Sequence, residues 1–130
     1  MKALTTEPGN EFHRFKLAHL AGYVADVDAQ ILAVASSEAH VVALLELKRS
    51  TIPVEAWRPF AADRVSYRML LELAHRAGLP LFVLYHVRGE LELESSVAVF
   101  RLLATAPEFR YRRAVLTGRE LVARWPELVE

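Results

Sequence analysis

Cysteine is absent from this chain of 130 residues. Its absence excludes disulfide bonds, zinc sites built on thiolates, and catalysis by a thiol nucleophile. No apolar run approaches the roughly 20 residues that a membrane-spanning helix needs. Residues 1–7 also lack the basic start and long apolar region of a secretory signal. We therefore expect a cytoplasmic protein that does not enter a membrane.

The chain has no excess of either charge, with 16 basic and 16 acidic residues. This balance argues against a strong, non-specific grip on nucleic acid. Lysine is scarce, at three residues against thirteen arginines. One of the three, Lys48, stands inside an apolar segment, which indicates a specific role rather than a general surface charge. A Gly-rich phosphate loop and a nucleophile elbow are both missing from the sequence.

The size and the 53% content of hydrophobic residues fit a single domain, residues 1–130, with a real core. Apolar periodicity and Gly or Pro stops predict helices over residues 11–20, 63–77 and 119–124, and strands over 25–35, 41–50, 81–87, 90–94, 97–103 and 111–115. In the second helix we expect an apolar face made by Val65, Met69, Leu70, Leu73, Ala74 and Ala77, with Asp63 as the N-cap. The third helix is expected to be capped by Thr117. A helix followed by the unbroken apolar strand 81–87 indicates an α/β fold.

Charged residues interrupt two successive predicted strands. Asp26 and Asp28 share one face of the segment 25–35, and Glu46 and Lys48 share one face of the segment 41–50, because strand side chains alternate. Burying such charges among leucines is costly unless something compensates, and a divalent cation held by carboxylates is one compensation. The alternative is an ordinary edge strand with solvated charges.

An acid on one strand followed by Glu-x-Lys on the next resembles the PD-(D/E)XK nuclease superfamily, which has the restriction-endonuclease-like fold. The resemblance covers about residues 9 to 87, and the motif here is Asp28, then Glu46-Leu47-Lys48. It implies a mixed central β-sheet flanked by helices. It also implies Mg²⁺ (or Mn²⁺) held by Asp28, Glu46 and the Leu47 carbonyl, with Lys48 supporting the attacking water or the phosphate. Between the two aspartates we prefer Asp28 as the ligand and keep Asp26 as a further candidate.

Further site residues are expected around this motif. By the same resemblance, Glu11 on the first helix is a candidate metal ligand, the alternative being a solvent-facing glutamate. Substrate contacts are expected from Arg49, Tyr67 and Arg68, the last two of which are otherwise surface residues. Trp57, in a loop made irregular by prolines, is a candidate stacking platform for nucleic acid or a plug of the local core.

The resulting functional expectation is magnesium-dependent hydrolysis of DNA phosphodiester bonds by water, without a covalent intermediate. A core of this size leaves little room for a separate element that recognises the DNA sequence. This favours a homodimer or dependence on a partner protein. Two alternatives remain open. One is a catalytically inactive module that keeps the fold and binds protein or nucleic acid. The other is an enzyme on a different substrate, with the strand acids as a general acid/base pair.

Overall fold

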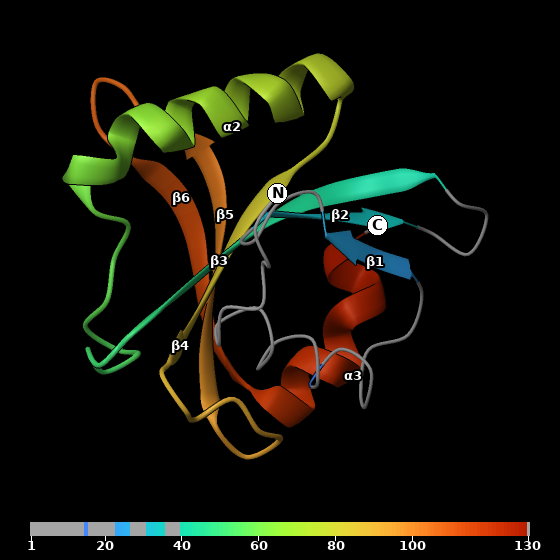
Figure 1. The fold of residues 1–130 in the computed structure, drawn as a ribbon, viewed down its shortest axis with the longest axis vertical. Helices are drawn as coiled ribbons and strands as arrows, with labels where there is room; N and C mark the ends of the chain where they lie inside the picture. The colour runs from blue at the N-terminus through green and yellow to red at the C-terminus, as the bar shows by residue number, and fades with distance from the viewer. Residues whose placement is uncertain (1–14, 16–22, 27–30, 36–39, 130) are drawn as a thin grey trace, which may run out of the picture.

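A single six-stranded sheet organises the computed structural model, which describes residues 15, 23–26, 31–35 and 40–129. The strands lie in chain order (Figure 1): β1 (Tyr23–Asp26), β2 (Ile31–Ala35), β3 (Val41–Ser50), β4 (Leu81–Val87), β5 (Ser96–Ala104) and β6 (Arg110–Thr117). Neighbouring strands are antiparallel except β3 and β4, which are parallel. The fold is therefore mixed α/β, as the sequence predicts.

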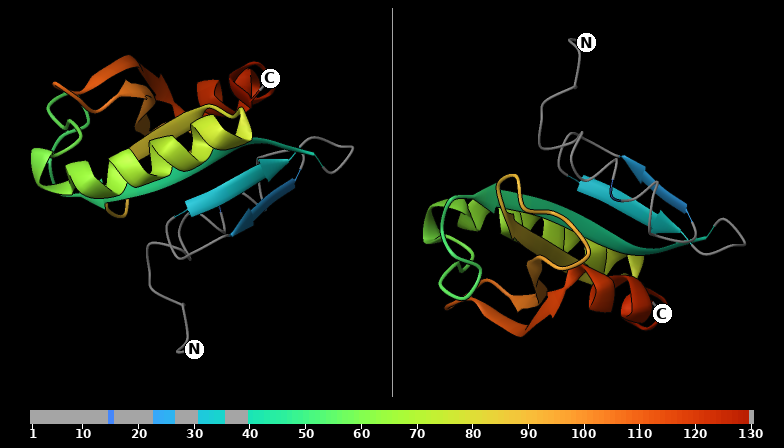
Figure 2. Two further views of the ribbon diagram at one scale, coloured as in Figure 1. Left: turned by 90° about the horizontal axis from the view of Figure 1, so that it is seen from above. Right: turned by 90° about the horizontal axis from the view of Figure 1, so that it is seen from below.

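The parallel pair requires a crossover, because the chain must return to the same end of the sheet before β4 begins. The crossover is a loop, the short 3-10 helix η1 (Ala61–Asp63) and helix α2 (Arg64–Ala77). Gly78 ends α2 in the left-handed conformation at φ 71°, as the sequence predicts. Figure 2 shows α2 stretched along β3 on one side of the sheet.

Two apolar clusters form the core, one on each face of the sheet. Residues of α2 pack with alternate residues of β4 and β5 on one face, whereas helix α3 (Gly118–Val129) packs on the other through Leu121 and Trp125. At the start of α3, Thr117 Oγ1 accepts from the Glu120 amide and Glu120 Oε1 accepts from the Thr117 amide, a capping box. This confirms Thr117 as the predicted cap. Among the described residues, no helix is long and apolar enough to cross a membrane.

Two strand predictions are wrong. Residues 25–35 do not form one strand, because β1 ends at Asp26 and β2, which begins at Ile31, runs antiparallel to it. Residues 90–94 form a bend and turn instead of a strand. There, Leu91 is buried against the α3 side of the core, and alternating glutamates alone did not signal this turn.

The predicted core face of α2 is only partly right, since Ala74 and Leu70 do pack against the core. Val65, Met69 and Leu73 are exposed at 70%, 67% and 54%, while the residues packed against the sheet are Tyr67, Leu71 and Ala74. The helix carries apolar residues on two sides, so periodicity alone does not fix its rotation. The burial of the large Tyr67 ring fixes the rotation of α2 about its axis. This rotation brings Tyr67 to the polar residues of β3.

Candidate functional site

The polar residues of β3 lie on the face that α2 covers. Alternation places Leu45 in the α3-side cluster and Leu44 in the α2-side cluster, so Glu46 and Lys48 point toward α2. Glu46 is buried, with 5% of its surface exposed, and the Lys48 side chain is 24% exposed. The two predicted catalytic residues of β3 are therefore side by side, with Lys48 Nζ 4.0 Å from Glu46 Oε2.

Asp63 joins this pair from another element. Its Oδ2 lies 3.9 Å from Lys48 Nζ, so the lysine stands between two carboxylates. The sequence predicts Asp63 as the side-chain cap of α2, but its side chain makes no capping hydrogen bond. Its carboxylate lies next to Lys48 instead. Nothing in local spacing signalled Asp63 as a site residue, because its partner is 15 residues away in the sequence.

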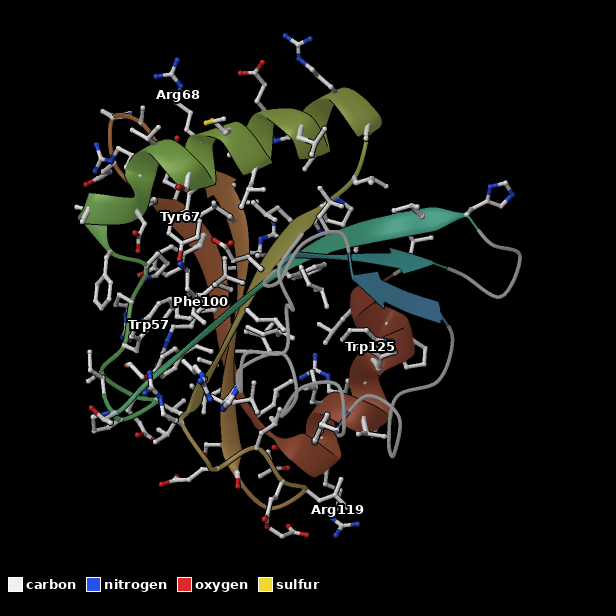
Figure 3. All side chains as sticks on the ribbon, in the orientation of Figure 1. Trp57, Tyr67, Arg68, Phe100, Arg119 and Trp125 are labelled. Carbon is white, nitrogen blue, oxygen red and sulfur yellow. The ribbon has the colours of Figure 1, made fainter. Side chains whose placement is uncertain are left out.

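Tyr67 borders the site on the side of α2 that faces the sheet. It is 0% exposed, its ring centroid lies 5.7 Å from Lys48 Nζ, and Figure 3 shows it pointing from α2 toward the sheet. Its hydroxyl is buried without a hydrogen-bond partner in the described part of the chain. Burial raises the pKa of Tyr67, and the nearby charges of Glu46 and Asp63 raise it further. The hydroxyl is therefore held in its protonated form near these charges.

A hydrogen-bonded network fixes the loop that borders the site. Tyr85 donates to the Ile52 carbonyl at 2.7 Å and shares a 2.6 Å hydrogen bond with Ser50 Oγ at the end of β3. Trp57 stacks on Tyr85, with ring centroids 4.4 Å apart and planes 4° apart, and is 2% exposed. Trp57 is thus a core residue, which is the packing alternative for this side chain. Its ring has no open face for a base.

The predicted arginines fall in different places. Arg68 lies on the outer side of α2 and points away from the sheet, opposite to Tyr67 (Figure 3). It is not brought together with Glu46 and Lys48. Arg49, next to Lys48 on β3, lines a pocket of about 280 Å³ that Lys48 also lines. The described residues around this pocket are Leu47, Lys48, Arg49, Ser50, Trp57, Phe60, Asp63, His86 and Arg88.

The remaining predicted acids are less defined. Asp28 and Glu11 lie outside the described residues. Asp26 ends β1, where its register partner is Leu32, which in turn pairs with Leu45 rather than with Glu46. Within residues 15, 23–26, 31–35 and 40–129, no group of three or more His, Asp or Glu residues is arranged to hold a metal ion. The described cluster is thus two carboxylates, one ammonium and one phenol.

This cluster has a definite chemical character. Lys48 supplies a compact cation beside a buried carboxylate, and Tyr67 supplies a hydrogen-bond donor. Because two carboxylates stand against this single ammonium, the cluster by itself favours a cation over a free anion. The chain matches no protein-family model, no curated protein and no solved structure.

Proposed function

We propose that this protein is a metal-dependent nuclease that hydrolyses DNA phosphodiester bonds, with Asp28, Glu46 and Lys48 as catalytic residues on a restriction-endonuclease-like fold. The observation that carries the proposal is the buried Glu46 carboxylate, 4.0 Å from Lys48 on the same face of β3. A buried charge on an apolar strand is costly, and chains retain such charges at functional sites more often than elsewhere.

The surrounding elements support the proposal. Glu46-Leu47-Lys48 lies on β3, helix α2 follows, and β4 comes next, which is the order that the resemblance to PD-(D/E)XK nucleases implies. Ile31 is the register partner of Glu46, and Asp28 precedes Ile31 by three residues in the sequence. The register aligns Asp26 with Leu32 and Leu45 and not with Glu46, so the proposal keeps Asp28 as the second acid, as the resemblance implies.

The donor atoms fit a hard cation. Mg²⁺ and Mn²⁺ prefer carboxylate and carbonyl oxygens, and the proposed ligands are the carboxylates of Glu46 and Asp28 with the Leu47 carbonyl. When bound, such an ion lowers the pKa of a water and offsets charge on the phosphate. The described residues supply two of these three ligands, so the proposal depends on Asp28 for the third.

The chain's own side chains take definite roles in this proposal. Lys48 places its ammonium beside a phosphate oxygen or the attacking water. Asp63 holds that ammonium from the α2 side at 3.9 Å and thereby limits its freedom. Tyr67, buried under α2 with its ring centroid 5.7 Å from Lys48 Nζ, confines the ammonium from the helix side. Pre-positioned donors of this kind stabilise charge that develops in a transition state.

The test is cleavage of linear, circular, single-stranded and branched DNA with Mg²⁺ or Mn²⁺. The native chain is compared with Lys48→Ala and with a matched control, Lys2→Ala, at equal purity. Metal-dependent cutting that survives in the control and disappears in Lys48→Ala supports the nuclease. Inert protein across all substrates and metals contradicts it. The metal should also raise the melting temperature of the native chain but not that of Glu46→Gln.

A second candidate is a catalytically inactive module that binds a protein or nucleic acid. The equal numbers of acidic and basic residues favour it over an enzyme that must hold DNA by charge alone. This candidate predicts binding without cleavage, unchanged in Glu46→Gln. For either function we propose a homodimer or a complex with a partner protein. Sedimentation of the purified chain separates the two, because only a homodimer forms without another protein.

A further inference from the structure

The pocket beside Lys48 has the dimensions and lining of a ligand site. It lies at the end of β3 that pairs with β4: among the described residues the pairing with β2 reaches Glu46, while that with β4 runs on to Ser50. Its volume of about 280 Å³ is just below the ~300–1,000 Å³ typical of small-molecule pockets. A pocket of this size suits one nucleotide and is too small for a base pair.

Positive charge dominates its described lining. Lys48, Arg49 and Arg88 stand against the lining acid Asp63 and against Glu46, which pairs with Lys48, so one formal positive charge is in excess here in a chain whose total is zero. Arg88 is exposed, and its amide donates to the Ser50 carbonyl, which ties it to the end of β3. Clustered cations of this kind attract phosphate.

An aromatic ring stands at the same pocket. Phe60 is 46% exposed although it is a large apolar side chain, and it lines the pocket. Its ring meets the buried Trp57 edge-on, with centroids 5.7 Å apart and planes 63° apart. Trp57 in turn is stacked on Tyr85, so Phe60 rests on a rigid base. An exposed, supported ring beside cations is the arrangement on which single-stranded nucleic acids stack their bases.

We propose that this pocket binds one unpaired nucleotide of the substrate, with Phe60 stacking on its base and Arg88 contacting its phosphate. The enzyme would therefore prefer single-stranded or frayed DNA to intact duplex. The inference rests on the proposed function for the identity of the ligand as nucleic acid. It extends that function by naming the form of the substrate and two residues, Phe60 and Arg88, that the sequence did not indicate.

The test measures binding without cleavage. Fluorescence anisotropy in EDTA compares a labelled octamer of thymidylate with a blunt hairpin duplex at one fixed salt concentration. We expect the single strand to bind at least about tenfold more tightly, and Phe60→Ala to weaken that binding about tenfold. Met69→Ala, at a 67% exposed position on the outer face of α2, is the matched control.

Salt dependence tests the cationic part. Arg88→Gln should weaken binding and reduce the slope of log affinity against log salt by about 0.7, the value for one phosphate on a single strand. Arg112→Gln, at an exposed position on β6, is its control and should leave the slope unchanged.

The outcomes separate this inference from the proposed nuclease. If Phe60→Ala binds the octamer as tightly as Met69→Ala does, or if the duplex binds as tightly as the single strand, the nucleotide pocket is wrong, whether or not the protein cuts DNA. If the octamer binds in a Phe60-dependent way and no DNA is ever cut, the pocket stands and the nuclease fails.

Discussion

The ammonium group of Lys48 lies 3.9 Å from the carboxylate of Asp63, so that a central strand and the start of the following helix meet at one ion pair. On the other side of the same ammonium, Glu46 lies 4.0 Å away. A flexible lysine between two carboxylates from different elements loses much of its freedom to move. The relationship makes Asp63 a positioning residue for Lys48 in the proposed reaction.

Asp63→Asn should therefore affect catalysis more than folding. The Asp63 side chain is 37% exposed, and ion pairs at such positions contribute about 1 kcal/mol or less to stability. We expect a small change in the denaturant midpoint and a fall in kcat of about tenfold, which corresponds to ~1.4 kcal/mol in the barrier. Asp63→Glu, which keeps the charge, should recover part of the rate. Equal rates in Asp63→Asn and the native chain would show that Lys48 needs no such support.

Two tyrosine hydroxyls provide a matched comparison. The buried hydroxyl of Tyr67 has no hydrogen-bond partner among the described residues, whereas Tyr85 bonds both Ile52 and Ser50. Tyr67→Phe should leave stability unchanged or raise it by about 1 kcal/mol, since an unsatisfied polar group is removed. Tyr85→Phe should lower stability by about 1–2 kcal/mol. Urea unfolding measures both, and a loss in Tyr67→Phe as large as that in Tyr85→Phe contradicts the assignment.

The raised pKa of Tyr67 also predicts how stability changes in alkali. Burial, reinforced by Glu46 and Asp63, keeps the folded phenol protonated at pH values where an unfolded tyrosine, with a pKa of about 10, ionises. The contribution of Tyr67 to the free energy of unfolding is therefore fully present below about pH 10, and it is lost as the pH rises further. Between about pH 9.5 and 11 the native chain should lose ~1 kcal/mol more than Tyr67→Phe does. Parallel stability curves for the two proteins would contradict the shift.

Much of the fold was predictable because local signals were strong. The unbroken apolar run of β4, the left-handed Gly78 and the Thr117 cap each predict an element that the structure contains. The division of the segment 25–35 into β1 and β2 was not predictable, because residues 27–30 contain no Gly or Pro and keep the alternation of apolar and polar residues. In the site, Glu46 and Lys48 were predicted to lie side by side, because alternate residues of a strand share one face. Asp63 was missed because only the crossover through the loop and η1 brings it back to β3.

The rotation of α2 gives a prediction that needs no functional assay. Leu71 is 7% exposed and packs against the sheet, whereas Leu73, two residues later, is 54% exposed. Leu71→Ala should cost about 2–4 kcal/mol, because it leaves a cavity in the core. Leu73→Ala should cost less than ~1 kcal/mol. Thermal unfolding of the two variants tests this rotation. A larger loss of stability in Leu73→Ala than in Leu71→Ala would mean that the opposite face of α2 is buried.

The coupling between Glu46 and Lys48 can be measured by a double-mutant cycle. Lys48→Met leaves the buried Glu46 carboxylate with less compensating charge, and we expect a loss of about 2 kcal/mol in the free energy of unfolding. Glu46→Gln removes the buried charge and should be nearly neutral for stability.

In the double variant Lys48→Met should cost less than it does alone, by a coupling energy of about 1–2 kcal/mol. Urea denaturation of the four proteins gives this energy, with Arg76 and Glu72, an exposed ion pair at 3.0 Å on α2, as a reference cycle of about 0.5 kcal/mol or less. Additive effects at Glu46 and Lys48 would mean that the two charges do not interact.

A cation bound in the site should weaken the coupling between Glu46 and Lys48. Because it compensates Glu46 in place of the lysine, Mg²⁺ should reduce the loss caused by Lys48→Met without affecting Glu46→Gln.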